Sequence, residues 1–206
     1  MIIVVAATDR QWNELIGTPA KTEWIRVSDG SAFKKNTEAA AFLNLQDDAH
    51  LFNYADLKKP VFINSVTHTL QQLNTTPNVL RINGWAGFLQ RPVWEIAGSV
   101  DDTIIAIVEG MHKKITVVKD EPGLIAARII SMIINEAYFA LGDNVSTKPD
   151  IDTAMQLGTN YPFGPFEWAE RIGLDNILTL LQQLSLTDTR YRPADRLVAE
   201  ATTPVQ

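Results

Sequence analysis

The sequence predicts an α/β unit followed by an all-helical unit, and three observations lead to this prediction. Short apolar runs alternate with helical segments as far as residue 119. Several of these runs are apolar without alternation, which is typical of strands buried on both faces of a parallel sheet. From Pro122 onward no strand pattern is found, and a long segment there is apolar nearly all round. We therefore expect domains at residues 1–119 and 120–206.

The first unit is expected to hold seven strands and three helical segments. The strands are predicted at Ile2–Ala6, Trp24–Val27, Leu51–Tyr54, Val61–Asn64, Val79–Ile82, Trp94–Ala97 and Lys114–Val118. The helical segments are predicted at Ser31–Leu45, His68–Leu73 and Val100–Met111. Strands separated by helical stretches favour βαβ units and hence an α/β sheet.

The second unit is expected to begin with a helix from Pro122 to Leu141 that Gly142 ends. At about 20 residues it would be about 30 Å long, and a second copy of the chain would cover its apolar surface. Further helices are expected from Thr147 to Gly158, from Pro165 to Gly173 and from Asp175 to Leu184. The residues from Thr187 to Gln206 are expected to form a polar tail that frays at its end.

The composition excludes several classes of function. A net charge of -6 argues against a nucleic-acid partner. The absence of cysteine excludes disulfides and thiolate chemistry, and the three histidines are too scattered in sequence to indicate a metal site. The apolar start predicts a buried strand rather than a signal peptide, and no apolar stretch is long enough to cross a bilayer. We expect a cytoplasmic protein.

Six short motifs in the second half resemble one enzyme family. They are DEPGLIAAR at 120–128, NEA at 135–137, DIDTAM with LG at 150–158, YPFGP at 161–165, IGLD at 172–175 and RYRP at 190–193. In order and spacing they are similar to D-x-P-G-F-I-x-N-R, N-E-A, D-I-D-x-A-M-x-L-G, P-M-G-P, I-G-L-D and R-Y-R-P of the 3-hydroxyacyl-CoA dehydrogenases. This family includes the 3-hydroxybutyryl-CoA dehydrogenases.

The resemblance implies an N-terminal Rossmann domain and an all-α dimerisation domain, with a fold like the C-terminal domain of 6-phosphogluconate dehydrogenase. It also implies NAD-dependent oxidation of 3-hydroxyacyl-CoA to 3-oxoacyl-CoA. The partners expected from it are an acyl-CoA ligand and a second copy of the chain, bound through the helix at 122–141.

The first unit departs from the features that NAD binding requires. No G-x-G-x-x-G follows the first strand, where the sequence reads AATDRQW, so the glycines that admit a pyrophosphate are missing. Asp9 would also place a carboxylate near the diphosphate. Asp29 could offer an acid to a ribose, but a turn at Asp29-Gly30 is the preferred interpretation. The stretch after the second strand is shorter than in the family. We expect a degenerate, shortened Rossmann-like domain in which no cofactor-binding residue is assigned.

The catalytic residues implied by the resemblance are only partly present. Glu95 corresponds to the family's Glu, but Asn83 takes the place of the His that removes the hydroxyl proton. An asparagine has no titratable nitrogen and cannot act as a general base. Ala127 replaces the family's substrate-contacting Asn. Ser65 or Thr67 could keep a hydroxyl in this region, although a strand-end cap is the commoner role for such a residue.

Three functional hypotheses follow from these departures. The preferred one is a catalytically degenerate, dehydrogenase-like protein that acts as a dimeric binding or regulatory protein. The second is an active NAD-dependent 3-hydroxyacyl-CoA oxidoreductase with a rearranged site. The third is an interaction subunit that pairs with a true dehydrogenase through the shared helical domain.

Overall fold

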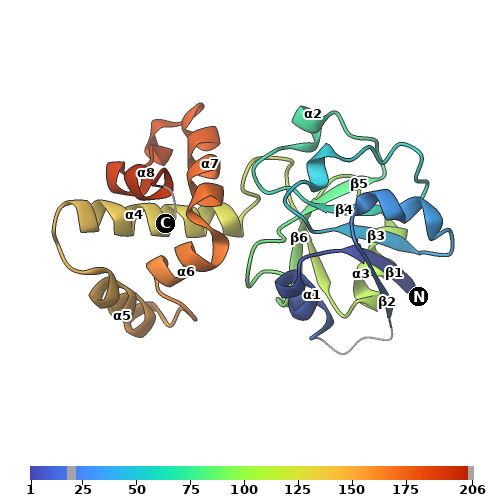
Figure 1. The fold of residues 1–206 in the computed structure, drawn as a ribbon, viewed down its shortest axis with the longest axis horizontal. Helices are drawn as coiled ribbons and strands as arrows, with labels where there is room; N and C mark the ends of the chain where they lie inside the picture. Colours follow the sequence, from blue (N-terminus) through green and yellow to red (C-terminus); the bar gives the residue numbers. More distant parts are fainter. Residues whose placement is uncertain (18–21, 204–206) are drawn as a thin grey trace. The chain divides into compact units, whose positions relative to one another are not determined.

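The computed structural model describes residues 1–17 and 22–203, and the chain divides into two compact units (Figure 1). The first unit is Met1–Leu124 and the second begins at Ile125. The division therefore lies after Leu124, whereas the sequence placed it after residue 119. The reason is that the segment from 120 to 124 is held by hydrogen bonds to the α/β unit, including one from Gly123 N to Val66 O at 2.8 Å.

Within the described residues, seven strands of the first unit form one Rossmann-like sheet. The strands are β1 (Ile2–Ala6), β2 (Glu23–Val27), β3 (Ala41–Asn44), β4 (Val61–Asn64), β5 (Val79–Ile82), β6 (Val93–Ala97) and β7 (Lys114–Val117). Their order in the sheet is β2-β1-β3-β4-β5-β6-β7. All neighbours are parallel except β5 and β6. The predicted α/β class of this unit is confirmed.

The two faces of this sheet are covered differently. The helices α1 (Asp9–Ile16) and α3 (Asp102–Gly110) bury apolar side chains in one cluster with β1 and β3. On the other face, Phe33 and Tyr54 bury aromatic rings in a cluster with Phe42 of β3. The short helices near that cluster are η1 (Gly30–Lys35), η2 (Ala49–Leu51) and α2 (Leu70–Leu73). The sheet thus has longer helices on one face and short helical turns on the other.

Two predicted elements of the first unit are wrong. The segment Ser31–Leu45 is not one helix, because it forms η1 and then strand β3, which lies between β1 and β4. Its apolar end is buried by pairing with both neighbours, which helical spacing alone does not reveal. The segment Leu51–Tyr54 is not a strand. The Tyr54 hydroxyl donates to Ala49 O at 2.6 Å and so closes an irregular loop.

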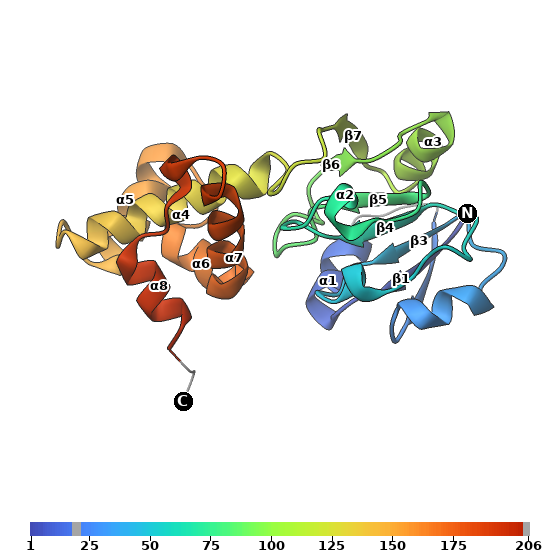
Figure 2. The ribbon, with the colours of Figure 1, turned by 90° about the horizontal axis from the view of Figure 1, so that it is seen from above.

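Every regular element of the second unit, within the described residues, is a helix. These elements are α4 (Ala126–Gly142), α5 (Lys148–Thr159), α6 (Pro165–Ile172), α7 (Leu174–Ser185), η3 (Thr189–Tyr191) and α8 (Asp195–Ala201). Helix α4 contacts α6, α7 and α8 and is the centre of the unit (Figure 2). Its side chains Ile130, Ile134 and Tyr138 are buried there.

Two predicted boundaries in the second unit need correction. Helix α4 begins at Ala126 rather than at Pro122, because Gly123 and Leu124 have left-handed backbone conformations, with φ of 84° and 50°. Helix α5 continues through Gly158 to Thr159, and the next residue, Asn160, is left-handed with φ of 55°.

The segment from Thr187 is also more than a polar tail, since Leu197 of α8 is buried. The fraying predicted for the last residues falls on 204–206, which lie outside the described residues. No helix in the described part of the chain combines the length and the apolar character that crossing a membrane requires.

Candidate functional site

The candidate site of the first unit is the sheet edge at the carboxyl ends of β1 and β3, which is called the crevice below. The chain passes from β1 to β2 on one side and then crosses to β3 on the other, so the strand order reverses between these neighbours. Open α/β sheets bind ligands at such a switch point. The residues that meet there come from the start of α1, from the end of β3 and from the loop after β5.

The amino end of α1 is capped by its own side chains. Thr8 Oγ1 accepts a hydrogen bond from Gln11 N at 3.3 Å, and Gln11 Oε1 accepts one from Thr8 N at 3.0 Å. The carboxylate of Asp9 lies in the same first turn, where it pairs with Arg26 Nη2 at 2.7 Å. The backbone donors that would bind a phosphate at a helix start are therefore partly used, and a negative charge lies beside them.

Gln11 reaches from α1 across the crevice. Its Nε2 donates to Leu45 O at 2.5 Å and, in a longer contact of 3.4 Å, to Gly84 O. Asn64, at the end of β4, donates to the same Leu45 O at 3.1 Å and accepts from Gly84 N at 3.0 Å. The side chain of Gln11 is buried, at 4% exposure. These bonds join α1, β3, β4 and the loop after β5.

A second contact fastens the loop after β5 to α1. The two carboxylate oxygens of Glu14 accept from Gly87 N at 2.9 and 3.0 Å. Gly84 must be a glycine here, because a Cβ atom would lie 2.7 Å from the side chain of Asn64. The loop that replaces the family's H-F-F-N-P segment is therefore held against the helix that would carry the diphosphate.

The acid at the end of β2 is also committed to the protein. Asp29 caps η1, where its carboxylate accepts from Ser31 N at 2.8 Å. Hydrogen bonds from the side chain and then the backbone of Ser31 hold the pKa of Asp29 below its usual range. The turn interpretation of Asp29-Gly30 agrees with this geometry. Together, the residues around the crevice do not fit a dinucleotide.

The relative positions of Asn83 and Glu95 follow from the antiparallel pairing of β5 and β6. Ile82 is opposite Ile96, so Asn83 and Glu95 occupy the next facing positions of the two chains. Asn83 Oδ1 accepts from Trp85 N at 3.1 Å, whereas its Nδ2 is buried without a hydrogen-bond partner. The structure thus brings together the two positions that the resemblance assigns to the His–Glu pair.

The other residues named from the resemblance have contacts of their own. Ser65 is buried after β4, where its Oγ donates to His68 O at 3.0 Å and closes a short turn. The Oγ1 of Thr67 lies 3.0 Å from His68 Nδ1. Ala127 belongs to α4 in the second unit and is wholly buried.

Two features of the first unit were not predicted from the sequence. Arg81 in β5 is wholly buried and donates through Nε to Ser65 O at 2.7 Å. A charged residue inside a strand of a parallel sheet was the available signal. His50 and His68 stack with ring centroids 5.2 Å apart. Burial, then the charges of His50 and Arg81, lower the pKa of His68.

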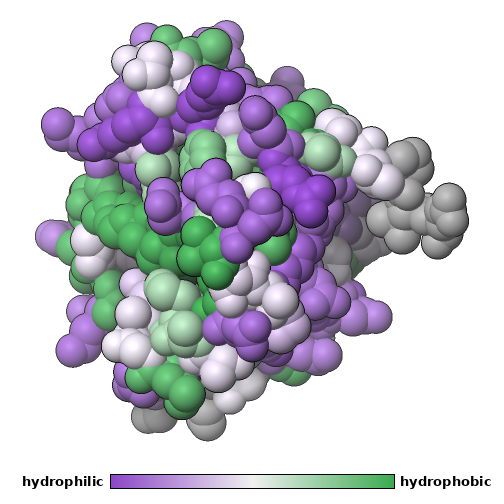
Figure 3. Space-filling view, turned by 90° about the vertical axis from the view of Figure 1, so that its left-hand side faces the viewer, coloured by the Kyte–Doolittle hydropathy of each residue, from purple (hydrophilic) through white to green (hydrophobic). Residues whose placement is uncertain are grey.

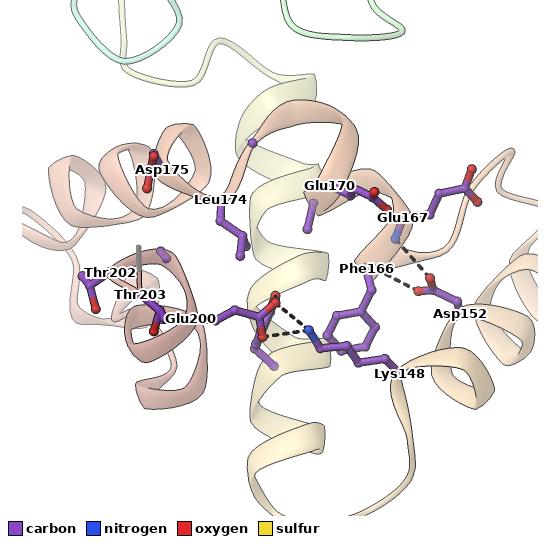
Figure 4. A pocket seen from close by; sticks show the side chains of 14 residues that line it. Lys148, Asp152, Phe166, Glu167, Glu170, Leu174, Asp175, Glu200, Thr202 and Thr203 are labelled. Carbon is purple, nitrogen blue, oxygen red and sulfur yellow. Dashed lines mark hydrogen bonds and ion pairs between the residues drawn. The ribbon is translucent and has the colours of Figure 1, made fainter. Parts of the chain in front are cut away.

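The second unit holds a cavity of about 740 Å³ beside Tyr138, Lys148, Phe166 and Glu200 (Figure 4). Lys148 Nζ pairs with the Glu200 carboxylate at 2.5 and 2.7 Å, and it lies over the rings of Tyr138 and Phe166. Burial, then the charge of Glu200, raise the pKa of Tyr138. In the described parts of the chain no group of three or more His, Asp or Glu side chains could hold a metal ion.

Comparison with known proteins identifies relatives of the second unit. Residues 123–203 match the family model of the 3-hydroxyacyl-CoA dehydrogenase C-terminal domain. The 3-hydroxyadipyl-CoA dehydrogenase of Escherichia coli (strain K12) is 45% identical over 95 residues, which are 45% of this chain and 20% of that protein. The 3-hydroxybutyryl-CoA dehydrogenase of Bradyrhizobium diazoefficiens is 42% identical over 93 residues, or 44% of this chain and 32% of that protein. The matches therefore span a third or less of these relatives.

A solved structure extends the likeness of fold to both units. It is the (S)-3-hydroxybutyryl-CoA dehydrogenase of Ralstonia eutropha, with a TM-score of 0.71 over 96% of this chain and 92% of that chain. The sequences are 19% identical, so this likeness concerns the fold alone.

Proposed function

Because residues 123–203 match the C-terminal domain of the 3-hydroxyacyl-CoA dehydrogenases, we propose that this chain is a dehydrogenase-like binding or regulatory protein that does not carry out hydride transfer. The observation that carries the proposal is the position of Asn83. It faces Glu95 across β5 and β6, where the resemblance requires a base. An amide nitrogen takes up no proton near neutral pH, so Glu95 has no imidazole to orient.

Several motif residues of the second unit have structural roles that support this proposal. The carboxylate of Asp152 accepts from Phe166 N at 2.8 Å and from Glu167 N at 3.0 Å, and so caps α6. Gly164 permits this approach, because a Cβ atom there would overlap Asp152. These motifs therefore account for a helical architecture, and retaining them requires no catalysis.

The Asn of the NEA motif has a similar role. Asn135 is buried in α4, where it donates to Arg192 O at 2.9 Å and accepts from Ala194 N at 2.8 Å. It thereby holds the RYRP segment, on which the chain turns before α8. One buried amide thus links the NEA motif to the RYRP motif.

Dimerisation is the second part of the proposal. Helix α5 has no buried residue, and Leu157 on it is 84% exposed. Ile129 and Phe139 of α4 are exposed as well, at 52% and 41%. Figure 3 shows apolar side chains gathered on one face of the helical unit. A second copy of the chain would cover such a surface, since exposed apolar patches mark interaction sites.

Asn83 also suggests how an acyl-CoA could be bound. Its Nδ2 is a buried donor without a partner, which is unfavourable unless an acceptor arrives. The carbonyl oxygen of a thioester or of a 3-oxoacyl chain is such an acceptor. Titration with acetoacetyl-CoA, followed by tryptophan fluorescence, should show saturable binding that Asn83→Ala weakens.

The decisive experiment is an assay of NADH oxidation with acetoacetyl-CoA, followed at the NADH absorbance band. We expect no turnover above background for the native chain, and none for Asn83→His, since the restored base still lacks a cofactor site. Turnover by the native protein that disappears in Glu95→Gln would overturn the proposal. The oligomeric state is a separate measurement, by light scattering of the native chain and of Leu157→Glu, with Leu51→Glu as the control on another exposed leucine, in the first unit. A native monomer would refute the dimer.

A further inference from the structure

We infer that the crevice at the carboxyl ends of β1, β3 and β5 is closed from within, with the side chains of Gln11 and Glu14 taking the place of a dinucleotide. The inference rests on the proposed function and deepens it. Loss of NAD binding would then be a built-in closure of the first unit, and not only the absence of glycines. The closing contacts would also be a source of stability for a domain that is always nucleotide-free.

Backbone donors at the start of α1 are already bonded within the protein. A diphosphate at a helix start is bound by backbone N–H groups that have no partner within the helix. Here Gln11 N is bonded to Thr8 Oγ1, and Thr8 N is bonded to Gln11 Oε1. Thr8 Oγ1 also donates to Gln11 Oε1 at 3.0 Å. Both ends of this capping box are satisfied before a ligand arrives.

The side chain of Gln11 also fills the space beside the start of α1. From this capping box the amide of Gln11 extends to Leu45 O, at the end of β3, and is buried. A pyrophosphate at a switch point passes between the first strand–helix turn and the neighbouring strand ends. The Gln11 side chain occupies that passage, so a pyrophosphate could enter only after this side chain moved away.

The loop on the far side of the crevice is also bonded to α1. Glu14 lies one helical turn beyond Gln11 and binds Gly87 N through both carboxylate oxygens. Gly84 is bonded on its N–H by Asn64 and on its carbonyl by Gln11. Opening the crevice would therefore break bonds at Leu45, Gly84 and Gly87 together. It would leave buried polar groups without partners, which is unfavourable.

The charge of Asp9 at the start of α1 also disfavours a bound diphosphate. Asp9 stands in the first turn of α1, and its ion pair with Arg26 directs that arginine to the protein's own carboxylate. Arg26 Nη2 also donates to Ala7 O at 2.9 Å, and its guanidinium lies over the ring of Trp12. Arg26 is thus engaged within the protein, while a diphosphate would meet the like charge of Asp9.

The first test measures nucleotide binding to the full native chain. Isothermal titration calorimetry with NADH, NAD and ADP should show no saturable heat, and thermal unfolding should not shift with any of them. A Kd below about 1 mM for any of the three nucleotides would overturn the inference.

The second test measures the closure itself. Gln11→Ala should lower Tm by about 5 °C, whereas Gln71→Ala, on the exposed surface of α2, should change Tm by about 1 °C or less. Equal effects of the two substitutions would overturn the inference. If Gln11→Ala does not fold, hydrogen exchange of the native protein provides the readout. The amides of Gly84 and Gly87 should exchange slowly, and rapid exchange at both would contradict a closed crevice.

These outcomes separate the inference from the proposed function. NADH binding without turnover would refute the closed crevice and leave the non-catalytic function standing. An absence of NADH binding together with an absence of acetoacetyl-CoA binding would retain the closure and refute the acyl-CoA part of the function. Turnover with NADH would refute both.

Discussion

Arg81 of β5 and Asp120, at the start of the chain segment that leaves the sheet, form an ion pair of 2.5 Å inside the α/β unit. Arg81 also donates to the carbonyl oxygens of Ser65 and Val66. Asp120 accepts from Leu70 N at 3.0 Å and from Gln71 N at 3.2 Å, at the start of α2. One buried guanidinium therefore joins the turn after β4 to the exit segment.

Breaking this pair should strongly destabilise the first unit. Arg81→Met removes the guanidinium from a buried cluster of acceptors, and the loss of unfolding free energy should be about 3 to 5 kcal/mol. Burial lowers the pKa of Arg81, and the Asp120 carboxylate acts in the opposite direction. The charge of the buried guanidinium is therefore stabilised by Asp120. Urea denaturation measures the effect, with Lys59→Met as an exposed control. A difference of less than about 1 kcal/mol between the two variants would show that the pair contributes little.

The cap of α6 should be sensitive at two positions. Asp152→Ala leaves two amide groups at the start of that helix without their acceptor, and should cost about 1 to 2 kcal/mol. Gly164→Ala should be at least as harmful, since the new Cβ would force Asp152 away. Thermal unfolding by circular dichroism compares both with Glu170→Ala, an exposed neighbour on α6. If Asp152→Ala behaves like Glu170→Ala, the cap has no energetic role.

The buried amide of Asn135 should be needed for docking of the C-terminal segment. Asn135→Ala leaves Arg192 O and Ala194 N buried without their partner, which predicts a loss of about 1 to 3 kcal/mol. Helix α8 should then be released, and limited proteolysis should cleave the variant near Arg192 faster than the native chain. Asn176→Ala is the control, because its amide bonds only within the turn between α6 and α7. Unchanged cleavage at Arg192 would contradict this role.

The stacked histidines predict a pH dependence of stability. The folded-state pKa of His68 lies below its ordinary value of 6.5, because of burial and then the charges of His50 and Arg81. Above pH 6.5 both states are neutral at this residue, and the full stability is present. As the pH falls below that value, the unfolded chain binds a proton that the folded chain resists, so the unfolding free energy decreases.

Denaturation at about pH 7 and about pH 5 measures this change. His68→Asn should reduce the difference between the two conditions, whereas His112→Asn should leave it unchanged, because His112 is exposed and has a φ of 59° that asparagine tolerates. An equal pH difference in both variants would exclude His68 as the source.

The strands of the first unit were predictable wherever burial leaves a local pattern. Ile2–Ala6 and Val61–Asn64 are continuous apolar runs, and both are strands with the predicted bounds. Strand β3 was missed because its four residues follow a segment with helical spacing, and its burial comes from β1 and β4 on either side. Such pairing joins residues far apart in sequence, which periodicity over a short window does not register.

By itself, the sequence determined that the second half is helical and that it resembles the C-terminal domain of the 3-hydroxyacyl-CoA dehydrogenases, because its motifs are local caps and turns spaced along one chain. It also placed an asparagine, Asn83, at the position where the resemblance assigns the base. Only the tertiary structure decided that Gln11 and Glu14 cross the crevice, that Arg81 holds Asp120, and that His50 stacks on His68. Each of these contacts joins separate elements across the fold. The order of strands in the sheet, rather than any local spacing, sets which side chains meet there.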